Sequence, residues 1–150
     1  MRILFSLGWL KAGAFSRKAF KSREVNLLFS EYLNRIAQVV PCEVSASRFR
    51  EPRPNGKVWI CERAQGAKAV SSEELSRELE KLLHSGCQEL QILIGGPDGF
   101  SKSELGGCQP DFLWSFGPLT FPHELAALIA AEQIYRAWTI LRNHPYHSGH

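Results

Sequence analysis

Apolar residues in this chain gather in short runs, separated by polar segments that contain glycine or proline. Runs of four to eight residues bounded in this way are typical of strands buried on both faces. We expect strands at residues 2–9, 42–47, 58–61, 90–94 and 112–116. The first run fits a buried strand better than an export signal, because Ser6 and Gly8 interrupt its apolar core.

Other stretches repeat their apolar residues every three or four positions, which is the spacing of an amphipathic helix. We expect helices at residues 18–39, 71–85 and 123–142, and a further short helix from Ser101. Ser71 and Glu74 form a capping-box pattern, and Pro41 and Gly86 end the first two helices. The alternation of strands and helices predicts an α/β fold in three layers, with a mostly parallel sheet flanked by helices.

The length and composition predict one globular domain over residues 1–150. Hydrophobic residues make up 44% of the chain, charged residues 22%, and no apolar run approaches the ~20 residues that cross a bilayer. The cysteines, which lie 19, 26 and 21 residues apart without the spacing of a zinc site, are Cys42, Cys61, Cys87 and Cys108. We therefore expect a cytoplasmic protein with reduced thiols and no membrane segment.

Charge permits a nucleic-acid partner without requiring one. The net charge is +3, and basic residues crowd two segments, 11–23 and 48–57. Such clusters bind RNA phosphates in some proteins and are solvated faces in most. Charge alone leaves both interpretations open.

In a parallel sheet, ligands bind beyond the carboxyl ends of the strands, so the loops there are the first place to seek a site. The segment 95–99, Gly-Gly-Pro-Asp-Gly, follows one predicted strand, and the segment 117–122, which contains two prolines, follows another. Neither has the GxGxxG or GK[ST] pattern of a phosphate-binding loop. Each segment either contacts a ligand through its backbone or is an ordinary connection.

The last residues, from 142 to 150, carry several ionisable and aromatic side chains. They include Arg142, His144, Tyr146, His147 and His150. Outside a helix this histidine spacing does not bring the rings to one face, so we expect no metal site. The remaining alternatives are a polar tail without function and a segment that takes part in a site.

Taken together, LIGGPDGFSKSEL and WSFGPLTFPHELAALIAAEQIYRAWTILRNHPYH resemble the RlmH family, SPOUT-class methyltransferases of large-subunit ribosomal RNA. The resemblance runs in register from about residue 92 to 147 and is looser before that. Two departures stand out. The helix that the family carries between its second and third strands is here reduced to the loop 49–57, and the path from Cys61 to Gly66 is slightly longer.

The resemblance implies a C-terminal trefoil knot, a homodimer, and S-adenosylmethionine as cofactor. It implies methylation of N3 of a pseudouridine in 23S ribosomal RNA, which we expect on the assembled 70S ribosome. The cofactor-binding residues it implies are Cys61, Gly95, Phe116, Gly117, Pro118, Leu119, Thr120 and Phe121. The candidates for catalysis are His147, Tyr146 and Arg136, and those for substrate binding are Tyr146, His147, Arg142 and His123.

The reaction so implied needs a group that accepts the proton of the imide nitrogen. Tyr146 and His147 follow a helix that we expect at the dimer interface, so the tail is placed to complete the partner's site, with Tyr146 stacked on the target base. Two rival hypotheses remain. One is a non-catalytic α/β protein that binds RNA or the ribosome, and the other is an α/β enzyme acting on a small molecule.

Overall fold

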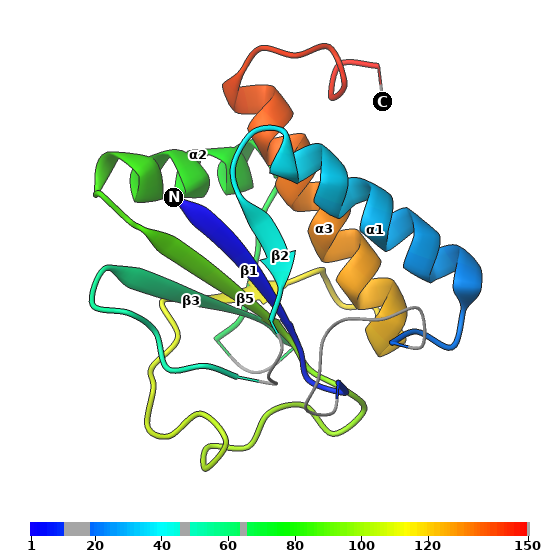
Figure 1. Cartoon of the computed structure of the whole chain (residues 1–150), viewed down its shortest axis with the longest axis vertical. Helices are drawn as coiled ribbons and strands as arrows, with labels where there is room; N and C mark the ends of the chain where they lie inside the picture. The colour runs from blue at the N-terminus through cyan, green and yellow to red at the C-terminus, as the bar shows by residue number, and fades with distance from the viewer. Residues whose placement is uncertain (11–18, 46–48, 64–65, 150) are drawn as a thin grey trace.

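A sheet of six parallel strands organises the molecule. The computed structural model describes residues 1–10, 19–45, 49–63 and 66–149. The strands are β1 (Arg2–Leu7), β2 (Cys42–Val44), β3 (Gly56–Cys61), β4 (Lys68–Ala69), β5 (Glu89–Ile94) and β6 (Phe112–Ser115). Their spatial order is β2-β1-β5-β3-β6-β4, and every neighbouring pair is parallel. The helices are α1 (Arg23–Ala37), α2 (Ser72–His84) and α3 (His123–Leu141) (Figure 1).

The α/β class and the parallel sheet are confirmed, and the trefoil knot stays a prediction. The first helix begins at Arg23, after the Ser22 cap, while its predicted start at residue 18 lies outside the described residues, as do residues 46 and 47 of the second predicted strand. The strand β3 begins at Gly56, inside the segment predicted as a loop. The strand β4 was not predicted.

The short helix predicted from Ser101 is wrong, because this segment forms turns. Ser101 and Glu104 do exchange the side-chain to backbone bonds of a capping box, at 2.8 and 3.2 Å. One turn later, Gly106 and Gly107 have φ values of +57° and +81°. A right-handed helix cannot continue through such residues.

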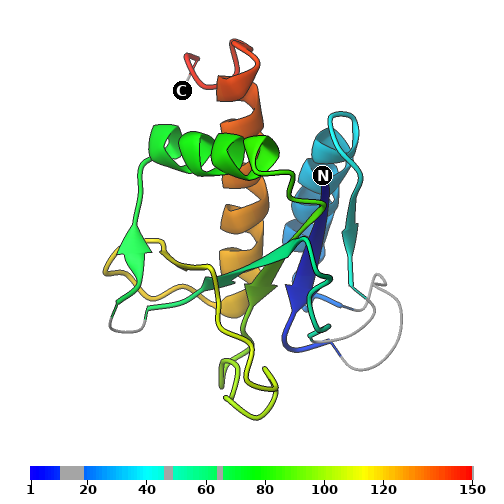
Figure 2. The same cartoon turned by 90° about the vertical axis from the view of Figure 1, so that its left-hand side faces the viewer.

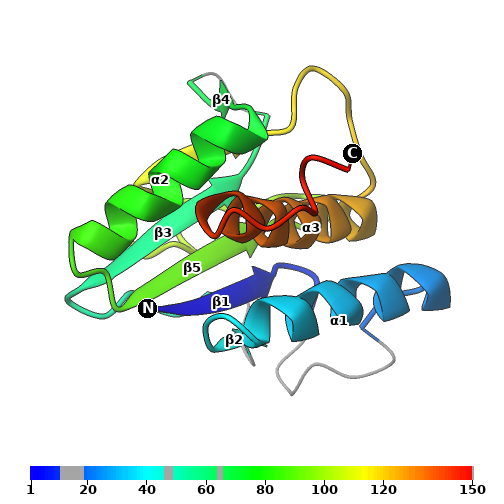
Figure 3. The ribbon, with the colours of Figure 1, turned by 90° about the horizontal axis from the view of Figure 1, so that it is seen from above.

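All three helices lie on one face of the sheet (Figures 2 and 3). Their apolar faces and alternate strand residues form one core, with Ile3, Phe5, Leu7, Phe29, Leu33, Ile36, Trp59, Leu75, Leu79, Leu90, Ile92, Ile94, Trp114, Ala127, Ala130, Ala131, Ile134, Ala137 and Trp138. The four buried alanines of α3 let this helix approach the sheet closely between α1 and α2. The expectation of helices on both faces, a three-layer fold, is therefore wrong.

The other face of the sheet, here called the reverse face, is covered by loops. Its core is Val58, Ile60 and Leu93, packed against side chains of the segments 49–55 and 99–113. No helix follows β2 in described residues 45 and 49–55. Between β2 and β3, the described residues thus contribute a loop to this face.

Buried charge holds the segment 49–55 on the reverse face. Glu89 of β5, 4% exposed, forms ion pairs with Arg50 and, at 3.4 Å, with Arg2. The neighbouring Gln91 side chain donates to the Arg50 carbonyl at 2.7 Å and accepts from Ser6 at 3.1 Å. A carboxylate at this position needs such partners, because an unpaired buried charge is strongly unfavourable.

The segment before α1 meets the start of α3. The Glu124 carboxylate accepts the backbone N–H groups of Lys21 and Ser22, both at 3.1 Å. This carboxylate therefore fixes the entry to α1 as well as lying in the first turn of α3, where the helix dipole favours it. None of the helices found among the described residues has the length and apolar character that spanning a membrane requires.

Candidate functional site

A cavity of about 500 Å³ opens beyond the carboxyl ends of β3, β5 and β6. Three separate segments line it, the one after β3, the glycine-rich one after β5, and the one between β6 and α3. The predicted residues that it brings together are Cys61, Gly95, Phe116, Leu119, Thr120, Phe121 and His123. Gly117 and Pro118 belong to the same loop but are not among its lining residues, and Gly117 lines a smaller cavity of about 250 Å³ beside α3.

Glycine at position 95 is explained by the loop itself. A Cβ atom there would lie 2.8 Å from the Cα atom of Gly99, closer than packed atoms allow. Gly99 has a φ of +66°, which favours glycine, and its N–H bonds to the Gly96 carbonyl at 3.0 Å. The two glycines therefore let the segment 95–99 fold back tightly, with its backbone forming one wall of the cavity.

The opposite wall is apolar and aromatic. The Phe116 ring meets Trp114 edge-on at 5.0 Å and Phe121 at 6.4 Å, and Leu119 is exposed at the cavity edge. Burial raises the pKa of the Cys61 thiol well above its usual range, so the thiol is neutral at physiological pH. This wall offers stacking and apolar contact, and it lacks a phosphate cradle.

His123 sits where α3 begins, and its ring is already engaged. The ring meets Trp9 at 4.6 Å between centroids, and its Nε2 atom lies 3.8 Å from a Glu124 oxygen. Trp9 is fixed in turn by donating to the Ala19 carbonyl at 2.8 Å. His123 therefore lines the cavity as a positioned ring.

The charged lining residues that sequence reasoning missed are Glu62 and Arg63. Both line the cavity, and an Arg63 N–H donates to the Thr120 hydroxyl across its mouth. The signal was their position directly after a strand end, but a charged pair in a polar loop has no pattern of its own. Glu62 also lines an adjoining cavity of about 460 Å³ that extends to Lys102 and Cys108 on the reverse-face side.

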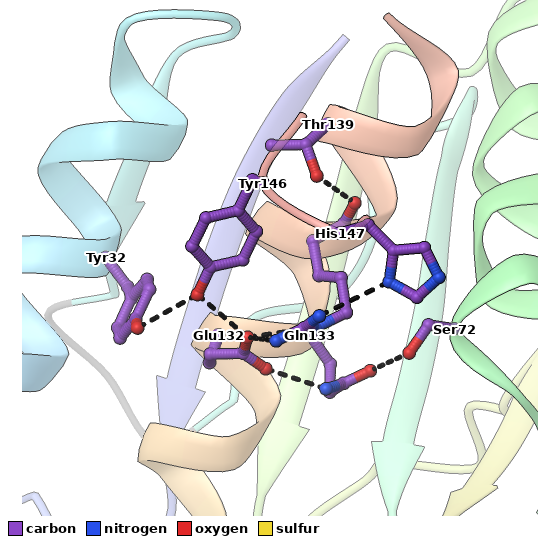
Figure 4. Close-up of polar contacts among 8 residues, drawn as sticks. Tyr32, Ser72, Glu132, Gln133, Thr139, Tyr146 and His147 are labelled. Atoms are coloured by element: carbon purple, nitrogen blue, oxygen red, sulfur yellow. Dashed lines mark hydrogen bonds and ion pairs between the residues drawn. The ribbon is translucent and has the colours of Figure 1, made fainter. Parts of the chain in front are cut away.

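The predicted residues Arg136, Tyr146 and His147 form a second group with Tyr32, Glu73 and Glu132, here called the tail cluster. Figure 4 labels Tyr32, Glu132, Tyr146 and His147 of this cluster. The Tyr146 hydroxyl donates to Glu132 at 3.0 Å and lies 3.1 Å from the Tyr32 hydroxyl. The Arg136 guanidinium lies 5.0 Å from the Tyr146 ring centroid. Burial raises the pKa of the Tyr146 phenol well above its usual value, and the bond to Glu132 adds to this effect. Tyr146 is therefore a neutral hydroxyl.

His147 is held between α3 and α2. Its Nδ1 atom lies 3.3 Å from an Arg136 nitrogen, and its Nε2 atom lies 2.8 Å from a Glu73 oxygen. An arginine can only donate, so these partners assign Nδ1 as acceptor and Nε2–H as donor to Glu73. The pKa of Glu73 is lowered, first by its own backbone N–H and then by His147.

Arg136 is bound to Glu132 through two nitrogens, at 2.6 and 3.0 Å. Burial lowers the pKa of Arg136, but the Glu132 carboxylate raises it overall, so the guanidinium stays charged. Gln133 extends the network to α2, since it donates to Glu132 and accepts from Ser72, both at 2.7 Å. The tail cluster therefore ties the last residues to all three helices.

Within one chain, the tail cluster and the cavity do not meet. The cavity reaches α3 at residues 123–126 and the cluster at residues 132–136. With a rise of 1.5 Å per residue, His123 and Arg136 lie about 20 Å apart along the helix. Figures 1 and 2 show the C-terminus at one end of α3 and the loop after β5 at the other.

A further cavity, of about 510 Å³, lies between the C-terminal ends of α1 and α3. Arg35, Arg142 and His144 line it, together with Trp138, whose buried indole N–H has no partner among the described residues. His150 lies outside the described residues. In the part of the chain that the structure describes, no three His, Cys, Asp or Glu residues come together as a metal site.

The two basic segments are only partly available to an RNA. Arg50 pairs with Glu89, and Lys57 lies 3.5 Å from Asp111, so both serve the fold. Lys21 and Arg23 are exposed, while residues 11–18 and 46–48 lie outside the described residues.

Comparison with known proteins agrees with this geometry. The family model described as "Predicted SPOUT methyltransferase" matches residues 45–147. A protein of Thioalkalivibrio sulfidiphilus named ribosomal RNA large subunit methyltransferase H is 36% identical over 143 residues, covering 82% of this chain and 89% of that protein. Proteins of the same name from Stenotrophomonas maltophilia and Alkalilimnicola ehrlichii are 38% and 48% identical, covering 79% and 53% of this chain and 86% and 50% of their own lengths. The chain belongs to the SPOUT methyltransferase family.

Proposed function

We propose that this protein transfers a methyl group from S-adenosylmethionine to N3 of a pseudouridine in 23S ribosomal RNA, on the assembled ribosome. The observation that carries the proposal is the cavity, which assembles most of the expected cofactor residues from three distant segments. The names of the relatives, which are large-subunit ribosomal RNA methyltransferases, support the substrate. In the cytoplasm, where we place the protein, both cofactor and ribosome are at hand.

The residues of the cavity fit this cofactor. Its volume of about 500 Å³ lies in the range of small-molecule sites. The rings of Phe116 and Phe121 and the neutral Cys61 thiol suit an adenosine, and the backbone of residues 116–121 offers N–H and C=O groups to its edge. When bound, the sulfonium supplies an electrophilic methyl group.

The tail is proposed to act on the RNA. His147 gives up its bond from Arg136 and accepts the imide proton on Nδ1, or hydrogen-bonds the target base there. Tyr146 stacks on that base, and the released Arg136 donor stabilises the negative charge that develops on it. Arg142 and His123 are proposed to contact the substrate. The cavity at Arg142 is also lined by Arg35 and by Trp138, whose indole N–H has no partner in the part of the chain that the structure describes. Because the tail cluster lies away from its own cavity, we place it at the cavity of a partner chain in a homodimer.

Filling the cavity tests the cofactor site. Ala126, in the first turn of α3, lines the cavity, so Ala126→Leu places a larger side chain where the ligand would lie without disturbing helix propensity. We expect the affinity for S-adenosylhomocysteine to fall about 10- to 100-fold in calorimetry. The matched control is Ala37→Leu, at an exposed position at the end of α1. Unchanged affinity in Ala126→Leu would place the cofactor elsewhere.

Exposed leucines on neighbouring helices test the homodimer. Leu27 and Leu28 of α1 are 61% and 45% exposed, and Leu125 of α3 is also exposed. We expect sedimentation at twice the 16.9 kDa chain mass at micromolar concentration, and a monomer for Leu28→Glu, because a charge is disfavoured in an apolar interface. Leu83→Glu on α2 is the control, since the Leu83 side chain is exposed to a similar extent, 39%. A wild-type monomer would contradict the dimer.

The function itself is tested with ribosomes. Purified protein and labelled S-adenosylmethionine should methylate ribosomes from cells that lack this protein, and mass spectrometry should place one methyl group on a pseudouridine of 23S RNA. Ribosome binding without methyl transfer would favour the non-catalytic binding protein. Cofactor binding without any RNA product would favour an enzyme acting on a small molecule.

A further inference from the structure

Two charged residues at the cavity mouth, Glu62 and Arg63, have no role in the proposed function. Glu62 and Arg63 come directly after β3, and both line the cavity. The Arg63 guanidinium donates to the Thr120 hydroxyl, which joins the loop after β3 to the loop before α3. Both loops therefore meet at a point where a cation faces the proposed ligand.

Arg63 is the only Lys or Arg among the described residues that line this cavity. His123 is the other basic side chain, and its ring lies against Trp9 and close to Glu124. The amino-acid end of the proposed methyl donor carries a carboxylate, which is costly to bind without a positive partner. A guanidinium is well shaped for a carboxylate, since it presents several N–H donors in one plane.

We propose that Arg63, together with Thr120, binds the α-carboxylate of the methyl donor. This inference rests on the proposed function. The Thr120 hydroxyl accepts its bond from Arg63, so its own proton is still available as a second donor to the carboxylate. The pair thereby fixes the amino-acid end and sets the direction in which the sulfonium methyl group points.

The neighbouring Glu62 favours this ligand over an RNA phosphate. Its carboxylate lines the same cavity, so it repels a polyanion but attracts the α-ammonium group beside the carboxylate of an amino acid. Opposite charges on adjacent residues thus match a zwitterion. A phosphate chain would meet attraction and repulsion at the same point.

The test compares three ligands by calorimetry on the full chain. They are S-adenosylmethionine, decarboxylated S-adenosylmethionine, which keeps the amine but lacks the carboxylate, and methylthioadenosine, which lacks the amino-acid end. We expect the wild type to prefer S-adenosylmethionine over the decarboxylated form by about tenfold or more, the scale of a charge-assisted hydrogen bond. Arg63→Gln should remove this preference and leave the affinity for methylthioadenosine unchanged.

A matched control and a second variant sharpen the result. Lys102→Gln removes a positive charge that lines only the adjoining cavity, and it should keep the wild-type preference. Thr120→Val should reduce the preference partly, because it removes the second donor. Unchanged methylthioadenosine affinity and unchanged thermal unfolding in Arg63→Gln would separate a direct contact from a distorted cavity.

The outcomes distinguish this inference from the function on which it rests. An Arg63→Gln protein that keeps the preference overturns the inference, and a simultaneous loss of ribosome affinity would assign Arg63 to RNA phosphate instead. A wild type that binds none of the three ligands overturns both the inference and the proposed cofactor. A wild type that binds methylthioadenosine but shows no preference for the carboxylate overturns the inference alone.

Discussion

A chain that ends at Pro145 is expected to transfer methyl groups at least about 100-fold more slowly than the full chain, with its cofactor affinity unchanged. It lacks Tyr146 and His147, the proposed stacking and proton-accepting groups, while its cavity is intact because no described residue of the tail lines it. A chain that ends at His147 keeps every contact of Tyr146 and His147 with Tyr32, Glu73, Glu132 and Arg136, and it should lose little. Single-turnover rates on unmethylated ribosomes measure both.

Mixing two impaired chains, at a cofactor concentration too low to saturate Ala126→Leu, tells whether the tail acts in the partner's site. The chain that ends at Pro145 has a cavity without a tail, and Ala126→Leu has a tail with a filled cavity. If the tail acts across the dimer, mixed dimers contain one complete site, and activity returns. If each tail served its own cavity, no mixture would be active, and the placement of the tail cluster proposed here would be wrong.

Removal of the buried Glu89 carboxylate on the reverse face is expected to have the largest effect on stability. Glu89→Ala leaves Arg2 and Arg50 without their shared partner, and loss of one member of a buried ion pair costs about 3–5 kcal/mol. Both arginines are about one-third exposed, so we expect a smaller loss of unfolding free energy, about 2–3 kcal/mol, in urea unfolding.

The control for this prediction is Glu43→Ala. Glu43 pairs with the same Arg2 at 2.7 Å but is 56% exposed, so its loss should cost less than about 1 kcal/mol. The difference in unfolding free energy between the two variants measures the effect of burying the carboxylate, since Arg2 is common to both pairs. Equal losses would mean that the ion pairs with Glu89 contribute no more than a surface pair.

The sequence predicted the main strands because each is an unbroken apolar run. Because such a run is apolar on both faces, it does not indicate which face the helices cover. In β3, Trp59 faces the helices and Ile60 faces the loops of the reverse face, yet both are apolar and buried. Periodicity therefore could not show that the helices of the described residues all lie on one face. The strand β4 could not be predicted for another reason. It has only two residues, Lys68 and Ala69, and both are exposed, so it has no apolar pattern.

For the site, sequence motifs predicted residues, but not their partners. Gly95, Phe116 and Phe121 lie in recognisable segments, and the cavity brings them together. The partners of the tail could not be predicted, because Tyr32 lies 114 residues from Tyr146, and Glu73 lies 74 residues from His147. Such pairs depend on how α1 and α2 pack against α3, which no local pattern encodes.

The bond between Glu124 and the start of α1 has a consequence for how the chain folds during synthesis. Residues 21 and 22 leave the ribosome about a hundred residues before the carboxylate that accepts their N–H groups. Until α3 follows, the apolar face of α1 has no helix to pack against, and β5 has no cover on that side. The N-terminal elements therefore cannot complete their packing before α3 has been synthesised. We expect slow and highly cooperative folding, as for other chains whose contacts are distant in sequence.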